Sequence, residues 1–275
     1  MVARVRRLAR IKRVGHTGTL DPMATGVLVL CLGKATRLIP YLEEAGGADA
    51  KEYDAVIRFG FETTTDDAEG EPRGEQREGV QAPEKSAIAD ALLTFVGEID
   101  QVPPSFSAKK VEGERAYARA RRGDEVVLEP VKVQIATATL ISVQGETASV
   151  RFASSRGTYI RALARDLGRL LGMGAHLVEL RRTRSGAHSL SEAVRLDELT
   201  ERALASGLKP MASILSDWPR FLANDDQIKD IRLGRAIRTG TTLKEDERFL
   251  ICDRPGDLTA LARAERGSLK PFCVF

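Results

Sequence analysis

The sequence of 275 residues predicts an α+β protein that ends in a small β-rich region. Alternating apolar and polar side chains are typical of half-buried strands. They occur in residues 53–61, 131–140 and 148–153, the last two around a turn at 144–146. Apolar residues at helical spacing follow from Ile160. Beyond about residue 208, short β-like stretches alternate with turn-forming residues, which indicates a separate C-terminal region.

The N-terminal elements can be placed from their apolar spacing. Apolar residues at three-residue steps predict a helix over residues 2–11, with arginines on its outer face and Gly15 beyond its end. The apolar run at residues 27–32 predicts a buried strand. A short helix at residues 35–42 is expected to lie behind it.

The central part of the chain alternates polar inserts with short helices. Residues 62–83 are acidic and contain glycine, so we expect an exposed loop or hairpin outside the core. Helices are predicted at residues 88–95 and 115–122, and the paired prolines make residues 102–106 extended or irregular. In the helix that starts at Ile160, an arginine stripe is either solvated or functional: Arg161, Arg165 and Arg169.

Charge and composition limit the classes of function. The net charge of +3 and a pI near 8.8 are only mildly basic. Three arginine-rich clusters suit a polyanion whose phosphates are held by cations, although a single cluster is as often a solvated face. They comprise Arg4, Arg6, Arg7, Arg10, Lys12 and Arg13; Arg119, Arg121 and Arg122; and Arg181, Arg182 and Arg184.

Cysteine and histidine usage argues against a metal site. Three cysteines without a C-x-x-C pair suggest neither zinc nor a disulfide framework, which fits a reduced, cytoplasmic setting. The three histidines are far apart and form no H-E-x-x-H. No apolar run is long enough to cross a bilayer, so we expect a protein without a metal and without membrane attachment.

The strongest candidate for chemistry lies at residues 15–26, which read GHTGTLDPMATG. This polar, turn-prone string contains one carboxylate, Asp21, and runs into the apolar residues 27–32. A carboxylate held on a Gly- and Pro-containing loop beside a strand can face a cleft as a nucleophile. The simpler alternative is that Asp21, followed by Pro22, caps the loop as an Asx-turn.

Two common catalytic motifs can be excluded. Gly33-Lys34-Ala35-Thr36 resembles the end of a phosphate-binding loop, but the spacing G-x-x-x-x-G-K-[ST] is not met. No G-x-S-x-G occurs, and the histidines have no evident nucleophile as partner. Nucleotide hydrolysis and Ser/His/Asp chemistry are therefore not indicated.

Several long segments together resemble the bacterial TruB tRNA pseudouridine synthases. They occur in the order of that family and cover most of residues 2–186, so they are far more specific than a lone motif. The matching strings are GHTGTLDPMATGVLVLCLGKATRL, KEYDAVIRFG, TTDDAEG, GEIDQVPPSFSAKKVEGERAYARARRG, SSRGTYIRALARDLG and GAHLVELRRTRSG.

This resemblance implies isomerisation of a uridine in the T loop of tRNA, position 55, to pseudouridine without cofactor or metal. By analogy Asp21 is the essential carboxylate, which attacks either the ribose or the uracil ring. Tyr53 would stack on the flipped base and help to remove the C5 proton, and Arg161 would pair with Asp21. Tyr159 and Leu180 would line the pocket.

Three further residues carry expectations from the resemblance. His16 would fill space near the extruded nucleotide, as an aromatic wedge rather than an acid or base. Lys110 and Arg121 are candidate contacts to RNA phosphates. Each assignment has a structural alternative: alone, Tyr53 would be a strand aromatic, Arg161 a solvated helix residue and Leu180 a core residue.

The expected architecture follows from the same resemblance. It is a pseudouridine synthase fold with a mixed, mostly antiparallel sheet, flanking helices and a central cleft, in a catalytic domain of residues 1–207. Residues 208–275 would form a small PUA-like domain that helps to grip the T arm. The chain starts inside the helix that follows the family's first strand and Lys-Pro turn, so it resembles an N-terminally shortened member, and we expect a monomer.

A rival function belongs to a different class. A non-catalytic protein on the same scaffold could clamp or fold tRNA without isomerising it, and the shortened N-terminus favours that reading. The presence of Asp21, Tyr53 and Arg161 favours the enzyme. A guide-RNA-dependent synthase resembles the quoted segments less well. Both main candidates bind tRNA in a salt-sensitive way, so only product formation separates them.

Overall fold

The computed structural model describes residues 1–44, 51–74, 79–106, 110–111, 114–115, 128–215, 217–254 and 257–275. These residues form two compact units, each assembled from segments that are far apart in the sequence. One unit comprises residues 19–28 and 46–192, and the other comprises residues 1–18, 29–45 and 193–275. The loop that carries Asp21 therefore belongs to a different unit from the residues on either side of it.

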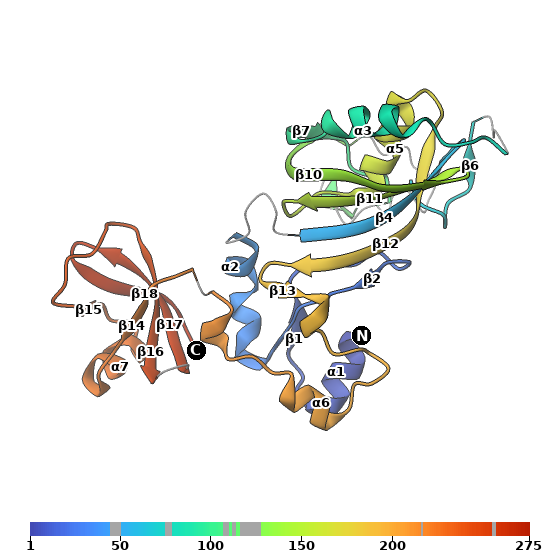
Figure 1. Ribbon diagram of the computed structural model, residues 1–275. Helices are drawn as coiled ribbons and strands as arrows, with labels where there is room; N and C mark the ends of the chain where they lie inside the picture. The colour runs from blue at the N-terminus through green and yellow to red at the C-terminus, as the bar shows by residue number, and fades with distance from the viewer. Residues whose placement is uncertain are drawn as a thin grey trace. The chain divides into compact units, whose positions relative to one another are not determined.

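The first of these units is built on a seven-stranded sheet (Figure 1). Its main path is β13-β12-β4-β11-β10-β7, with every neighbouring pair antiparallel, and β2 adds to β12 in parallel. The predicted mixed, mostly antiparallel sheet is thus confirmed. The strands are β2 (Thr25–Gly26), β4 (Lys51–Phe59), β7 (Gly97–Gln101), β10 (Val131–Gln144), β11 (Thr147–Ser154), β12 (Ala175–Ser185) and β13 (His188–Ser189).

Two helices, α3 (Lys85–Leu93) and α5 (Ile160–Leu170), cover one face of this sheet (Figure 1). The alternation in β4 explains why, since Tyr53, Ala55, Ile57 and Phe59 are all buried beneath them. The opposite face of β4 is polar, and there Asp54 pairs with Arg151 of β11. The period-two pattern read from the sequence therefore gave the correct buried face.

The same unit contains short hairpins and a turn that lie outside the seven-stranded sheet. β5 (Glu62–Thr63) pairs with β6 (Pro72–Arg73), and β8 (Lys110–Val111) pairs with β9 (Glu114–Arg115). A short 3-10 turn, η2 (Leu190–Glu192), follows β13. The helix predicted over residues 115–122 lies outside the described residues apart from its first position.

The other unit contains a five-stranded sheet in the order β14-β16-β17-β18-β15. The strands are β14 (Arg220–Leu222), β15 (Ile237–Arg238), β16 (Arg248–Arg254), β17 (Asp257–Glu265) and β18 (Ser268–Val274). One face packs on α7 (Asp225–Arg232), and the other packs on Leu38, Ala212 and Leu215. This sheet confirms the predicted β-rich C-terminal region.

A further, smaller core of this unit brings together segments from its N-terminal and C-terminal parts. α1 (Val2–Ala9) contributes Val5, which packs with Val14 and Leu199. The other elements are β1 (Val14–His16), β3 (Leu30–Leu32), η1 (Gly33–Leu38), α2 (Ile39–Glu44), α6 (Glu201–Ser206) and η3 (Met211–Ser213). The arginines of α1 are exposed, and Arg4 and Arg10 contact the chain around α6.

Two expectations from the sequence need correction. Residues 27–32 do not form one strand, because β2 ends at Gly26 and β3 begins at Leu30. Residues 62–83 are not wholly outside the core, since Thr63, Asp66 and Asp67 are buried. Of the arginine stripe left open as solvated or functional, Arg161 and Arg165 are buried while Arg169 is half exposed. The buried acids and the two buried arginines pack against one another.

Candidate active site

The loop of residues 19–28 presents Asp21 beside β12. A turn begins at Asp21. The Ala24 N–H closes it by donating to the Asp21 carbonyl at 3.0 Å, and Pro22 occupies the position that proline favours. The loop then runs parallel to β12, and the Val27 N–H donates to the Arg182 carbonyl at 2.8 Å. The sequence thus holds the carboxylate on a short turn that is fixed to the sheet.

Asp21 faces Arg161, in the first turn of α5. Arg161 Nε lies 3.0 Å from Asp21 Oδ2, and Arg161 Nη2 lies 3.0 Å from Asp21 Oδ1. This two-pronged geometry orients a carboxylate more firmly than a single contact. The Arg161 side chain is only 7% exposed while that of Asp21 is 28% exposed, so the carboxylate is held from within and remains reachable from outside.

Arg161 is in turn held by groups that the sequence interpretation did not single out. Its Nη1 lies 3.3 Å from Asp67 Oδ2 and donates to the Thr65 carbonyl at 3.0 Å. Its Nη2 also donates to the Phe106 carbonyl at 3.2 Å. A buried guanidinium requires such partners because an unpaired buried charge is costly. The signal that could have revealed Asp67 is the string TTDDAEG, whose two adjacent acids pair with the first two of the three arginines in α5.

The adjacent acid forms a second buried pair one helical turn further on. Arg165 Nη1 lies 2.8 Å from Asp66 Oδ2, and Arg165 Nε lies 2.8 Å from Asp166 Oδ1. Burial raises the pKa of Asp66, and the positive charge of Arg165 opposes that rise. Asp66 and Asp67 therefore bind two successive turns of α5, at Arg165 and Arg161. The contact with Asp67 holds the part of the Arg161 side chain that does not face Asp21.

Tyr53 and Leu180 lie on neighbouring strands. Both are buried in the same core cluster, Tyr53 on β4 and Leu180 on β12. Burial raises the pKa of Tyr53, a hydrogen bond from Arg182 opposes the rise, and the negative charge of Asp21 adds to it. The phenol is thus within electrostatic reach of Asp21. The structure brings the predicted Asp21, Arg161, Tyr53 and Leu180 into one unit.

Tyr159 immediately precedes α5 and is fixed by a buried glutamine. Its N–H donates to Gln101 Oε1 at 2.8 Å, and Gln101 Nε2 donates to the Tyr159 carbonyl at 3.1 Å. Gln101 comes from β7, at the edge of the sheet. This reciprocal pair sets the start of α5, and therefore the position from which Arg161 extends.

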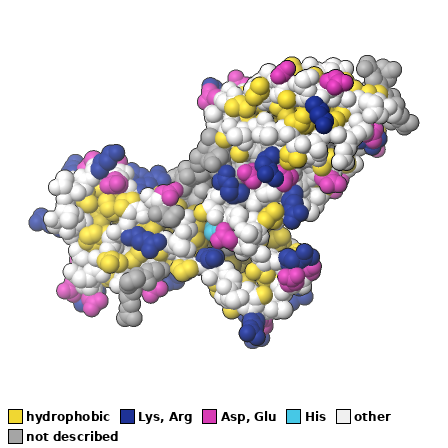
Figure 2. Space-filling model, viewed as in Figure 1, with side chains coloured by type: hydrophobic (Ala, Val, Ile, Leu, Met, Phe, Trp, Pro, Cys, Tyr) yellow, Lys and Arg dark blue, Asp and Glu magenta, His cyan; other side chains and the backbone are white. Residues whose placement is uncertain are grey.

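The other predicted residues lie elsewhere. His16 is on β1 in the other unit, where the Gly18 N–H donates to its Nδ1 at 3.3 Å. Lys110 is in β8, but its side chain, like all of Arg121, falls outside the described residues. In the third basic cluster, Arg182 is buried and cannot act as a solvent-facing phosphate contact. Over the visible face, Lys and Arg side chains are interspersed with Asp and Glu (Figure 2).

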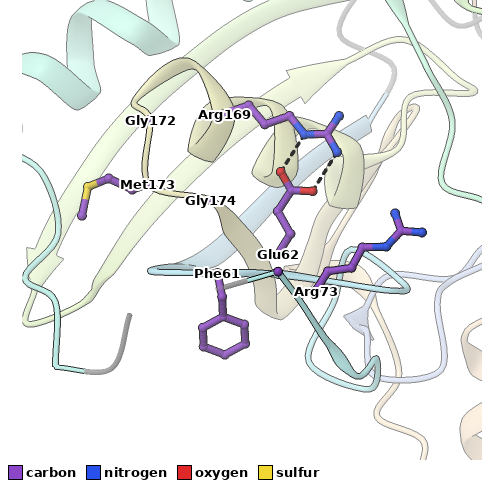
Figure 3. Close-up of a pocket in the computed structure, with 8 residues that line it drawn as sticks. Phe61, Glu62, Arg73, Arg169, Gly172, Met173 and Gly174 are labelled. Carbon is purple, nitrogen blue, oxygen red and sulfur yellow. Dashed lines mark hydrogen bonds and ion pairs between the residues drawn. The ribbon is translucent and has the colours of Figure 1, made fainter. Parts of the chain in front are cut away.

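A hollow of about 500 Å³ lies beside the C-terminal end of α5 (Figure 3), and Asp21 does not line it. Two hydrogen bonds of 2.6 and 2.7 Å join Arg169 to Glu62 inside it. The bond from Arg169 holds the pKa of Glu62 below its usual value. The other lining residues are Phe61, Arg73, Gly74, Gly172, Met173 and Gly174, and none is a predicted site residue.

In the described part of the chain, no group of three or more His, Cys, Asp or Glu side chains is arranged to hold a metal ion. Among the same residues, no helix combines the length and apolar character that a membrane span requires. What the site offers is one accessible carboxylate, a buried guanidinium that orients it, and a buried phenol.

Comparison with known proteins assigns the class. A family model described as the N-terminal domain of TruB family pseudouridylate synthases matches residues 6–160, and a model of the tRNA pseudouridylate synthase B C-terminal domain matches residues 161–216. The fold is shared with a chain from "Crystal Structure of a Cbf5-Nop10-Gar1 Complex", at a TM-score of 0.70 and 25% identity over 100% of this chain and 79% of that one. A chain from an H/ACA RNP bound to a substrate RNA containing 2'-deoxyuridine also has a TM-score of 0.70, at 23% identity over 100% of this chain and 80% of that one. The molecule is therefore a pseudouridylate synthase by class, an isomerase.

Curated relatives narrow the class to one family. The tRNA pseudouridine synthase B of Thermobifida fusca (strain YX) is 50% identical, over 100% of this chain and 93% of the relative. That of Arthrobacter sp. (strain FB24) is 43% identical over 100% and 91%, and that of Caulobacter vibrioides is 38% identical over 100% and 90%. The chain belongs to the TruB family of pseudouridylate synthases.

Proposed function

We propose that this chain converts the uridine at position 55, in the T loop of tRNA, into pseudouridine. The relatives named above are tRNA pseudouridine synthases, which supports tRNA as the substrate. The observation that carries the proposal is the two-pronged contact between Asp21 and Arg161, because it leaves one accessible carboxylate with a fixed direction of attack.

The reaction moves one glycosidic bond. The bond from C1′ of the ribose to N1 of uracil breaks, the ring turns, and a bond forms between C1′ and C5. The hydrogen on C5 leaves as a proton, and N1 ends with a proton, so the product is an isomer that needs no oxidant or reductant. Asp21 serves as the nucleophile, toward either the ribose or the uracil ring.

The neighbouring groups supply stacking, orientation and proton transfer. Tyr53 offers an aromatic face for the extruded base and helps to remove the C5 proton, and Leu180 and Tyr159 line the pocket. Arg161 orients Asp21 and, because Asp67 and two main-chain carbonyls fix it, does so without reorganising during the reaction. His16, which belongs to the other unit, is assigned a contact with the substrate RNA.

RNA binding outside the reacting nucleotide is assigned to cationic groups and to the C-terminal sheet. Lys110 and Arg121 contact phosphates. The PUA-like domain of residues 208–275 follows the catalytic domain of residues 1–207 and binds the T arm. The protein acts as a monomer in the cytoplasm. The exposed arginines of α1 add long-range attraction to the polyanion.

The test is pseudouridine formation in an unmodified tRNA transcript by the parent chain and by Asp21→Asn, with a transcript whose T-loop uridine is replaced by cytidine. We expect product only from the parent and only on the intact transcript. A parent chain that is folded and binds tRNA but makes no product contradicts the proposal and supports the non-catalytic alternative. Product on the substituted transcript contradicts the assigned position.

A further inference from the structure

Arg182 is the largest fully buried side chain among the described residues, with 1% of its surface exposed. It lies on β12 opposite Tyr53 of β4, with both side chains directed into the unit. A guanidinium is rarely buried to this extent unless its hydrogen bonds and charge serve a specific arrangement. The mechanism described so far gives this residue no role.

The side chain of Arg182 contacts the Asp21 loop on both sides of Asp21. Its Nε donates to the Val27 carbonyl at 2.7 Å, and its Nη1 reaches the Thr19 carbonyl at 3.5 Å. The same guanidinium lies opposite Tyr53, close enough for its positive charge to oppose the rise in the pKa of the phenol. One planar group therefore contacts the two flanks of the loop beside the aromatic residue proposed to stack on the base.

The main chain of Arg182 holds the same loop. Its carbonyl accepts a hydrogen bond from the Val27 N–H at 2.8 Å, within the parallel pairing of β2 and β12. Gly26 packs so closely that a Cβ added to it would lie 2.1 Å from the Arg182 carbonyl oxygen. No side chain separates the loop from the strand at this point, so a small displacement of Arg182 also displaces the loop.

We propose that Arg182 is a positioning residue that locks the loop of residues 19–28 against Tyr53, so that the carboxylate of Asp21 and the stacking ring are presented in one fixed geometry. This inference rests on the proposed function for its kinetic consequence. Lysine cannot replace arginine here, because a single ammonium lacks the planar fork that reaches several acceptors in fixed directions. A misplacement of about 1 Å in a reacting group costs on the order of 10²-fold in rate.

The kinetic experiment uses the full chain with Arg182→Met, Arg182→Lys and the control Arg151→Met. Arg151 is exposed on β11 and pairs with Asp54 on the polar face of the sheet. Single-turnover pseudouridine formation is measured with enzyme in excess, at a temperature where each variant is folded by circular dichroism. We expect the rate to fall about 10²-fold in Arg182→Met and about 10-fold in Arg182→Lys, with the Kd for the transcript changed less than about threefold. Arg151→Met should match the parent.

A second measurement does not depend on catalysis. Amide hydrogen exchange followed by mass spectrometry reports the opening of residues 19–28 separately from that of the β10–β11 hairpin. In Arg182→Met we expect exchange to accelerate at least about 10-fold in peptides covering residues 19–28 and to stay unchanged in peptides covering residues 131–154. This result would support the positioning role even if the parent made no pseudouridine, which would contradict only the proposed function.

Three outcomes overturn the inference. One is a folded Arg182→Met with the parent rate and the parent exchange pattern. Another is a rate loss accompanied by an equal loss of tRNA affinity, which would place Arg182 in substrate binding. The third is faster exchange spread evenly over the whole unit, which would mean that Arg182 only stabilises the fold.

Discussion

Arg161 reaches both carboxylate oxygens of Asp21 at 3.0 Å, while its remaining nitrogen lies 3.3 Å from Asp67. One buried cation is therefore shared between an accessible carboxylate and a buried one. The accessible carboxylate can react, whereas the buried one, at 4% exposure, can only hold the cation in place. The different roles of the two carboxylates follow from their burial alone and lead directly to testable predictions.

Replacing Arg161 by lysine should uncouple charge from orientation. The ammonium preserves one positive charge but cannot bridge Asp21, Asp67 and two main-chain carbonyls at once. We expect the single-turnover rate of pseudouridine formation to fall by about 10²–10³-fold while tRNA affinity changes only a few-fold. Rapid-quench assays and filter binding measure the two quantities. A rate within about threefold of the parent would show that charge without direction suffices.

Asp67→Asn should lower both activity and stability. The substitution keeps the shape but removes the charge opposite Arg161 and weakens the hydrogen bonds that the carboxylate accepts from the Thr65 hydroxyl at 2.6 Å and the Glu69 N–H at 3.0 Å. We expect the free energy of unfolding to fall by about 1–3 kcal/mol, and the rate to fall about 10-fold.

Asp54→Asn provides the matched control for this prediction. It removes an equivalent Asp–Arg pair from the partly exposed face of the same sheet, where such pairs contribute about 1 kcal/mol or less. Urea unfolding of both variants gives the comparison. Equal losses in the two variants would mean that the burial of Asp67 adds nothing.

The sequence predicted the strands and the residues of the candidate site better than it predicted which polar residues are buried. Tyr53 to Phe59 could be assigned correctly because alternation depends only on neighbours in the chain. The burial of Asp66 and Asp67 could not, because it depends on Arg161 and Arg165 in a helix about 95 residues further on. An acidic, glycine-containing string looks solvated until the matching cations are placed beside it.

The prediction of a single strand over residues 27–32 was wrong for a related reason. Its composition indicated one strand, yet the chain divides there between two compact units, with Val27 bound to β12 and Leu30 bound to β1. Periodicity carries no information about which sheet accepts each half. Likewise, Arg182 was grouped with exposed basic neighbours, although β-strand alternation places it on the side opposite Arg181.

The stability of the protein should decrease in mild acid through His176. This residue is buried, with Nδ1 3.1 Å from the Phe61 carbonyl, and burial lowers its pKa from the ordinary value of 6.5. Below pH 6.5 the unfolded chain takes up a proton that the folded chain binds less readily, so the free energy of unfolding falls as the pH drops. One such group contributes a slope of at most about 1.4 kcal/mol per pH unit.

His176→Gln isolates this contribution, because glutamine can still donate a hydrogen bond to the Phe61 carbonyl but does not titrate. Urea unfolding at pH 7.5, 6.5 and 5.5 should show a smaller loss of stability toward acid in the variant than in the parent. Parallel pH profiles for the two proteins would assign the acid sensitivity to other groups.

Gly26→Ala should impair activity out of proportion to a single methyl group. Gly26 has a φ of +98°, where side chains are strained, and its Cβ would meet the main chain of Arg182 at 2.1 Å. Backbone cannot move aside as a flexible side chain can, so the loop must shift away from β12 and carry Asp21 with it. We expect a rate loss of at least about 10²-fold in single-turnover assays.

The control is Gly145→Ala, in the β10–β11 turn. Gly145 has a φ of +55°, but the space that an added Cβ would occupy is open, so the substitution should cost about 1–2 kcal/mol of stability and leave the rate unchanged. If both variants lost stability equally and kept the parent rate, contact between the loop and β12 would have no part in placing the nucleophile.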